Sequence, residues 1–257
     1  SVIIPFHRDL NDLKKALISV NNQRLKKGFS IEICIGNDSK LKKEFLEEQL
    51  SIFSKYNINV FNNKIESGPG NARNAAINGS KGEILAFLDA DDYWYKNKLF
   101  YQIKEIEKGY NFVVTNFKYR GRDIIILNPE KIINHKSFFF SRSIGTSTVI
   151  ITRALLNTNR FMNIKFCQDI LFWSSVSKSF KFKYKSIKKC LVSYSLNGRT
   201  SQSSYFERFF YFFKACSIAK LNMVEIFLAM SHYSTKGLIN RFFKIIFDRI
   251  QKKFLFH

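Results

Sequence analysis

The sequence predicts an α/β fold in which a mostly parallel central sheet is flanked by helices and followed by a helical, basic and aromatic C-terminal extension. Three observations support this fold class. Strand-like and helical patterns alternate through the first hundred residues, in the β-α-β order of a nucleotide-binding parallel sheet. The runs at 2–4 and 84–88 are wholly apolar, which is typical of strands buried on both faces. From Ser204 onward the composition shifts to aromatic and basic residues.

The first half of the chain is expected to alternate strands with helices. A strand at 2–4 has its end fixed by Pro5, and the apolar spacing from Leu10 to Val20 predicts a helix capped by Asp9 or Asn11. The elements expected next are a strand at 31–36, a helix at 41–56, a strand at 58–61, a short helix around 74–76 and a strand from 83 that runs into acids at 89–92.

The second half should extend the sheet. In chain order we expect a helix at 98–107, two antiparallel strands at 112–117 and 123–127, a core segment at 138–140, a small-residue entry at 144–148 leading into a strand, an aromatic helix from about 168 and a basic, strand-like run from 178 to 194. Ser204 and Glu207 then form a capping box that opens an aromatic helix, and a last amphipathic segment covers 238–254.

Three carboxylates follow the apolar strand within four residues: Asp89, Asp91 and Asp92. Acids gathered at a strand end repel one another and lose hydration, so they need a counter-charge. Mg²⁺ and Mn²⁺ take oxygen ligands and share them with the phosphates of a substrate. The cluster therefore predicts a metal–diphosphate site, and the alternative is a polar turn with solvated acids.

The residues just upstream carry a resemblance to a known family. Residues 68–74 read Gly-Pro-Gly-Asn-Ala-Arg-Asn, a Lys-Gly-Glu turn follows at 81–83, and the apolar strand ends in Asp-Ala-Asp-Asp at 89–92. This composite pattern resembles the family 2 glycosyltransferases, inverting enzymes with the fold called GT-A. The resemblance covers roughly residues 1–200 and leaves the tail uncovered.

The resemblance implies roles for individual residues. Asp91 would bind Mn²⁺ or Mg²⁺, Asp89 would contact the metal or the ribose, and Asp92 would support one of them. Asp169, at a helix start about eighty residues after the acidic motif, matches the catalytic base. The substrate- and nucleotide-binding candidates are Pro5, Phe6, Arg8, Asp38, Arg73, Asp89, Asp92 and Arg199.

Two positions depart from the family pattern. Asn37 replaces the first acid of the segment before Asp38, and Gln168 replaces the acid before Asp169. Simpler alternatives stand beside three of the assignments: an Asx turn at 37–39, helix capping by Asp169, and a solvated turn around Arg199.

The composition limits the class of partner. A net charge of +22 indicates an anionic partner, although the Lys-, Asn-, Ile- and Phe-rich composition of an AT-rich genome would give part of it. No zinc or RNA-binding motif points to nucleic acid, and no Walker loop points to phosphoryl transfer from ATP. The four scattered cysteines are typical of reduced thiols in a cytosolic protein. We see no secretory signal and no apolar run that would span a bilayer.

These patterns lead to an expected organisation and function. Residues 1–203 would form the GT-A domain, with a nucleotide-sugar half at 1–95 and an acceptor half at 96–203, and residues 204–257 would form the extension. The basic aromatic extension would lie on an anionic membrane surface at the cytoplasmic face, and its alternative is packing on the domain or on a second subunit of a homo-oligomer.

The enzyme would move a sugar from a nucleotide-diphosphate sugar, a UDP-sugar, to a hydroxyl of a saccharide or lipid-linked acceptor with inversion, in surface polysaccharide or lipopolysaccharide synthesis. One rival is a sugar nucleotidyltransferase, but residues 6–8 lack its glycine-rich loop. The other is a basic membrane- or nucleic-acid-binding protein without catalysis.

Overall fold

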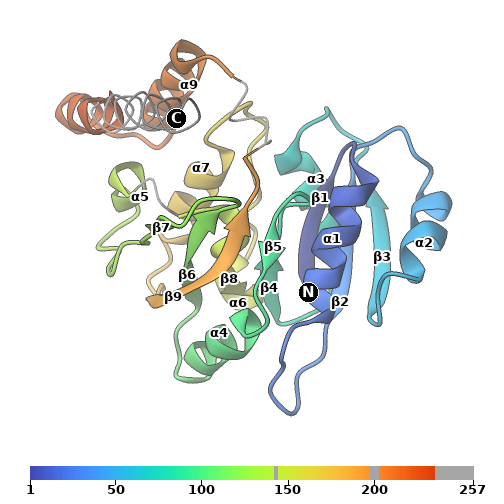
Figure 1. Ribbon diagram of the computed structural model, residues 1–257. Helices are drawn as coiled ribbons and strands as arrows, with labels where there is room; N and C mark the ends of the chain where they lie inside the picture. Colours follow the sequence, from blue (N-terminus) through green and yellow to red (C-terminus); the bar gives the residue numbers. More distant parts are fainter. Residues whose placement is uncertain (142–143, 197–202, 235–257) are drawn as a thin grey trace, which may run out of the picture.

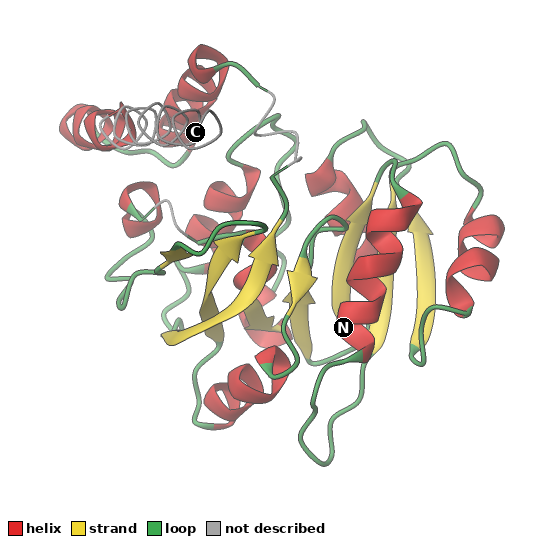
Figure 2. Cartoon of the chain, in the orientation of Figure 1, coloured by secondary structure: helices red, strands yellow, loops and turns green. Residues whose placement is uncertain are grey.

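The computed structural model describes residues 1–141, 144–196 and 203–234. Nine strands of this part form one sheet in the order β3-β2-β1-β4-β8-β6-β9-β5, and β7 pairs with β6. Helices cover both sides of the sheet (Figures 1 and 2). The predicted fold class is confirmed by this architecture.

The first half is parallel, as expected. Its strands are β1 (Val2–Phe6), β2 (Glu32–Asn37), β3 (Asn57–Asn62) and β4 (Ile84–Phe87), and its helices are α1 (Leu10–Asn21), α2 (Lys43–Ser51) and α3 (Pro69–Gly79). Val2 is paired with Ile33 on one side and with Ala86 on the other. All four carboxyl ends therefore meet at one edge of the sheet, where ligands bind in open α/β folds.

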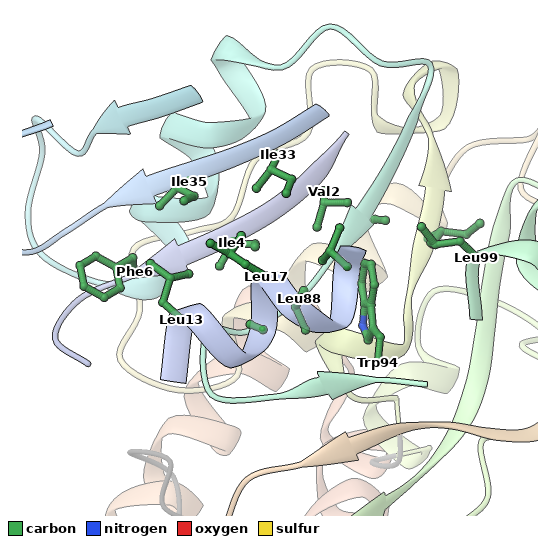
Figure 3. Close-up of a cluster of buried hydrophobic side chains, with 14 of the residues drawn as sticks. Val2, Ile4, Phe6, Leu13, Leu17, Ile33, Ile35, Leu88, Trp94 and Leu99 are labelled. Atoms are coloured by element: carbon green, nitrogen blue, oxygen red, sulfur yellow. The ribbon is translucent and has the colours of Figure 1, made fainter. Parts of the chain in front are cut away.

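Side-chain alternation along β1 explains how the two helix layers are held. Ile4 packs with Leu13 and Leu17 of α1 in one buried cluster (Figure 3). Ile3 packs on the opposite face with Ala76 of α3. A strand buried on both faces must be apolar at successive positions. The run at 2–4 is apolar at all three positions.

Two helix boundaries show what the sequence determines locally. Asp9 caps α1, since its side chain accepts the backbone N–H groups of Asn11 and Asp12 at 2.9 and 3.1 Å. The helix expected at 41–56 is wrong in length, because α2 ends at Ser51. The Asn21 side chain donates to the Phe53 carbonyl at 2.6 Å and accepts the Lys55 N–H at 3.2 Å. These two hydrogen bonds hold the chain after α2 in a turn.

The second half is mixed. Its strands are β5 (Tyr93–Trp94), β6 (Phe112–Tyr119), β7 (Ile125–Ile126), β8 (Ile150–Thr152) and β9 (Tyr184–Tyr194). Its helices are α4 (Lys98–Glu107), α5 (Ser137–Phe140), the 3₁₀ turn η1 (Thr146–Thr148), α6 (Arg153–Leu156) and α7 (Gln168–Val176). β8 lies antiparallel between β4 and β6 and joins the two halves. The antiparallel pairing of β6 with β7 is confirmed.

Aromatic side chains fill the second half of the core. Phe87 of β4 packs edge-on against Phe172 and Trp173 of α7, with ring centroids 6.2 and 5.2 Å apart. Phe138 and Phe139 are buried, as expected for a core segment. α7 is thereby fixed against the strand that leads into the acidic loop.

The chain then continues through α9 (Tyr205–Ile218) and helical residues 223–234. Ser204 accepts the Glu207 N–H at 3.1 Å, which is one half of the expected capping box. No helix within residues 1–141, 144–196 and 203–234 is long and apolar enough to cross a membrane. The segment expected at 238–254 lies outside the described residues. None of the four cysteines, all of which lie in the described part of the chain, forms a disulfide.

Candidate active site

The acidic residues lie in a tight turn beyond β4, not in the strand itself. β4 ends at Phe87, and the Leu88 N–H still bonds the Ile3 carbonyl at 3.0 Å. The Asp92 N–H then bonds the Asp89 carbonyl at 3.0 Å and closes the turn. This turn stands at the carboxyl edge of the parallel strands, as the position of the acids in the sequence predicts.

Asp92 faces inward and both of its carboxylate oxygens are used. It is 2% exposed, one oxygen accepts from Ser147 Oγ at 2.6 Å, and the other accepts the Ser195 N–H at 2.9 Å. Burial and the charges of Asp89 and Asp91 raise the pKa of Asp92 well above its ordinary value. These contacts suit the supporting role expected of Asp92 and leave its carboxylate little room for a ligand.

Asp91 is the acid whose environment most resembles a metal ligand's. Burial and the neighbouring Asp89 charge raise the pKa of Asp91 to about 6, so its ionised form lacks a sufficient counter-charge. In the described part of the chain, no group of three or more His, Cys, Asp and Glu side chains could hold a metal alone. The residues fit a divalent cation that takes Asp91 and Asp89 and completes its shell with phosphate oxygens.

Arg73 ties α3 to this loop. Its side chain is 6% exposed, and Nη2 forms an ion pair with Asp89 Oδ1. Its guanidinium lies 5.3 Å from the centre of the Phe161 ring. The Nε–H is buried without a hydrogen-bond partner. Arg73 therefore positions an acid of the loop, a contact that its expected place near the nucleoside did not predict.

Asn74, the residue after Arg73, holds the loop that contains Phe161. The Asn74 side chain donates to the Phe161 carbonyl at 2.8 Å and accepts the Phe161 N–H at 2.9 Å. These two hydrogen bonds to the backbone of one residue hold the Phe161 ring beside the Arg73 guanidinium. The Ala-Arg-Asn sequence of α3 thus positions both the Arg73 side chain and the loop that contains Phe161.

Asp169 brings the second half of the chain into the same site. It is half-buried in the first turn of α7, whose N-cap is Cys167 and not Asp169. Burial raises the pKa of Asp169, the Arg73 charge opposes that rise, and the Asp89 charge adds to it. The Asp169 carboxyl thus lies within electrostatic range of Arg73 and Asp89.

Gln168 makes the contact between the two helices. A Cβ added to Gly70, in the first turn of α3, would lie 2.2 Å from Gln168 Oε1 and 3.2 Å from the Met162 carbonyl. Only glycine allows this approach of α3 to α7 without rearrangement. The residue that replaces the family's acid is therefore a packing contact between the helices that carry Arg73 and Asp169.

Asp38 lies at the end of β2, and its carboxylate is engaged. It accepts from Asn63 Nδ2 at 2.8 Å, Ser67 Oγ at 2.7 Å and the Gly68 N–H at 3.0 Å. Asp38 thereby orders the loop that leads into α3. The Asx turn weighed for Asn37 is present, because its side chain accepts the Ser39 N–H at 3.0 Å.

The remaining nucleotide candidates occupy the same edge with different accessibility. Pro5 is half-buried and pairs with Gly36, Phe6 is buried in the core, and Arg8 is exposed. The Phe6 carbonyl accepts the Asp38 N–H at 2.8 Å, so Phe6 shapes the edge through its backbone. Arg199 lies outside the described residues.

The sequence did not reveal the residues that brace the acidic loop. Tyr194 Oη accepts the Ser147 N–H at 2.8 Å, and a Cβ on Gly145 would lie 2.2 Å from that oxygen. The small residues at 144–148 therefore allow close approach of a tyrosine. Arg120, which donates to the Asp91 carbonyl at 3.0 Å, belongs to no motif that the sequence analysis identified.

Comparison with known proteins places these features in context. Residues 1–170 match the model of the family described as Glycosyl transferase family 2. An uncharacterized glycosyltransferase of Rickettsia bellii is 33% identical over 186 residues, which are 69% of this chain and 26% of that one. The UDP-Glc:alpha-D-GlcNAc-diphosphoundecaprenol beta-1,3-glucosyltransferase WfgD of Escherichia coli is 29% identical over 182 residues, 69% of each chain.

Solved structures share the fold. S. aureus TarS 1–349 in complex with UDP-GlcNAc superimposes with a TM-score of 0.63 at 20% identity, covering 90% of this chain and 70% of that one. The chain thus spans about a quarter of the length of its Rickettsia relative and about two thirds of WfgD and of TarS 1–349.

Proposed function

Because the chain belongs to glycosyl transferase family 2, we propose that it transfers a sugar, with inversion, from a nucleotide-diphosphate sugar to an acceptor hydroxyl. One observation carries the proposal: Arg73 of α3 forms an ion pair with Asp89 of the acidic loop, and the same helix contacts Gln168, the neighbour of Asp169, through Gly70. A leaving-group site and a base must flank the same reacting carbon, and the contact between the helices that carry Arg73 and Asp169 supports such an arrangement.

The donor is proposed to be a UDP-sugar. The E. coli relative is named for UDP-Glc, and TarS is described with UDP-GlcNAc. The nucleotide would lie along the edge formed by Pro5, Arg8 and Asp38, with Arg73 and the acidic loop at its diphosphate end. The engaged Asp38 carboxylate supports a role in shaping this edge.

Asp91 and Asp89 would hold Mn²⁺ or Mg²⁺ at the diphosphate. When bound, such an ion supplies Lewis-acid stabilisation of the charge on the departing diphosphate, worth several kcal/mol. Arg73 would hold the Asp89 carboxylate in place through their ion pair. Asp92, through Ser147 and Ser195, keeps the turn in shape.

Asp169 would act as the base. It takes the proton of the acceptor hydroxyl as that oxygen attacks the anomeric carbon. The new bond joins this carbon to the acceptor oxygen, and the bond to the diphosphate oxygen breaks on the opposite face, which inverts the carbon. Burial raises the pKa of Asp169 and the Arg73 charge opposes that rise, and a raised pKa makes its carboxylate a stronger base.

The acceptor is proposed to be a saccharide hydroxyl on a lipid carrier, used in surface polysaccharide or lipopolysaccharide synthesis at the cytoplasmic face of the membrane. The E. coli relative is named for a diphosphoundecaprenol-linked acceptor. The basic C-terminal segment supports a peripheral place at an anionic bilayer.

The experiment that tests the activity measures UDP release from UDP-sugars with Mn²⁺, with and without a diphosphate-lipid-linked GlcNAc acceptor. We expect acceptor-dependent release, and the anomeric configuration of the product should be opposite to that of the donor. Release that stays the same after Asp91→Asn and Asp169→Asn would overturn the proposed chemistry.

A further inference from the structure

Within the described residues, the C-terminal helices have one apolar face that is covered and one that is exposed. In α9, Phe212, Ala215 and Cys216 are buried against Ile226 and Ala229 of the helical residues 223–234. This cluster also contains Phe139 and Leu171 and fixes the helices to the domain near α5 and α7 (Figure 1). The inner face of α9 thus has its full complement of packing partners.

The other face of α9 carries exposed aromatic side chains. Phe206, Phe210 and Phe213 follow one another at helical spacing and are 80%, 56% and 44% exposed. The helical residues 223–234 add four more exposed apolar side chains, namely Met223, Val224, Phe227 and Leu228. We call these seven residues the exposed apolar stripes. Exposed apolar surface on this scale marks a binding surface.

The charge of this part of the sequence favours one kind of partner. Residues 201–257 contain nine Lys or Arg and three acids. Among the described residues, Lys214 of α9 and Lys220 of the turn after it are exposed. A second copy would bring the same positive charge, on a chain of net +22, against its own. An anionic lipid surface complements both the cations and the aromatic side chains.

We propose that the exposed apolar stripes dock on an anionic lipid bilayer, with the phenylalanines of α9 entering its interface. This deepens the proposed function, on which it rests for the identity of the acceptor, because a lipid-linked acceptor lies in the same surface. Docking would hold the site near the acceptor, since cations supply long-range attraction and aromatic residues supply a salt-resistant anchor.

Vesicle flotation of the full chain tests this directly. The vesicles contain phosphatidylglycerol and phosphatidylcholine, and the key variant combines Phe206→Ser, Phe210→Ser and Phe213→Ser. The matched control is Phe180→Ser, because Phe180 is 93% exposed and precedes β9, outside the stripes. Phe206→Ser alone serves as a milder variant that leaves the covered face of α9 untouched.

At about 1 M salt, where the Debye length is about 3 Å, binding should depend on the aromatic residues alone. There the triple variant should bind about a hundredfold more weakly than the parent, and Phe206→Ser about tenfold more weakly. The Phe180→Ser control should bind normally, and all variants should keep their melting temperature.

Three outcomes would overturn the inference. Unchanged flotation of the triple variant removes the stripes from membrane binding. A lowered melting temperature with normal flotation means that residues 235–257 cover the stripes, and a parent dimer that the triple variant dissociates means that a second copy does. Metal-dependent UDP release without vesicles reports the proposed function separately, so that a failure of docking and a failure of catalysis are distinguishable.

Discussion

Ser147 connects two acids of the active-site turn: its hydroxyl donates to the Asp92 carboxylate at 2.6 Å and accepts the Asp89 N–H at 3.0 Å. Because Tyr194 holds the Ser147 backbone in turn, the η1 segment acts as a brace behind the acidic loop. The direction in which Asp89 and Asp91 point toward a diphosphate therefore depends on residues more than fifty positions away in the sequence.

Ser147→Ala should weaken both the fold and donor binding. It would leave a fully buried Asp92 oxygen and the Asp89 N–H without their partner, at a cost of about 1–3 kcal/mol in the free energy of unfolding. Thermal unfolding and Mn²⁺-dependent UDP binding measure the two effects. Ser217→Ala, which removes an exposed hydroxyl bonded only within α9, should change neither, and equal effects of the two substitutions would refute the brace.

Asp91 should make protein stability depend on pH. Without metal, its contribution should fall as the pH rises, and with Mn²⁺ and UDP it should grow. Its folded pKa of about 6 lies above the ordinary value of 3.8, so in the absence of metal its contribution is fully present below 3.8 and is lost as the pH rises through about 6. The loss should be about 1–3 kcal/mol. With Mn²⁺ and UDP the ionised form is the binding form, so the stabilisation by these ligands should grow over the same range.

Thermal-shift measurements from pH 4 to 7 on the parent and on Asp91→Asn would show this. The variant should lack both slopes while keeping its fold, and Asp123→Asn, which changes a fully exposed acid, should retain them. Metal-dependent UDP binding that survives in a folded Asp91→Asn protein would exclude Asp91 as a metal ligand.

Asp169→Asn should retain donor binding and lose turnover by about 10²–10⁴-fold or more, because the amide cannot accept the proton of the acceptor hydroxyl. The variant should also be no less stable than the parent, since burial disfavours the charged carboxyl that it removes. Initial rates with the lipid-linked acceptor, together with the UDP dissociation constant, separate the two effects. Near-normal turnover would reduce Asp169 to a structural residue of α7.

The sequence predicted those parts of the molecule that local patterns encode. The strands of the first half are runs buried on both faces, and Asp9 caps α1 by contacts two and three residues away. The acidic motif, Arg73 and Asp169 were found through a composite pattern. The roles that the family resemblance implies for Arg73 and Asp169 stay predictions.

Long-range and very short features escaped prediction. β5 contains only Tyr93 and Trp94, too few residues to show a period. The hydrogen bond between Ser195 N–H and Asp92 joins positions 103 residues apart, so no local sequence pattern could predict it. The contacts of Asp38 with Ser67 and Gly68, which the fold brings to it from about thirty residues away, were likewise not predicted.

The approach of α3 to α7 leads to a last prediction. Gly70→Ala would place a Cβ 2.2 Å from Gln168 Oε1 and 3.2 Å from the Met162 carbonyl, so the Gln168 side chain must leave its buried site or the helices must separate. We expect a loss of about 1–3 kcal/mol in the free energy of unfolding and a lower turnover, because Arg73 and Asp169 sit on the two displaced helices. Gly68→Ala is the matched control, since its added Cβ would make only a 3.6 Å contact with Asn163. Adding Gln168→Ala to Gly70→Ala should restore part of both losses in a double-mutant cycle, and additive effects of the two substitutions would show that this contact does not couple the helices.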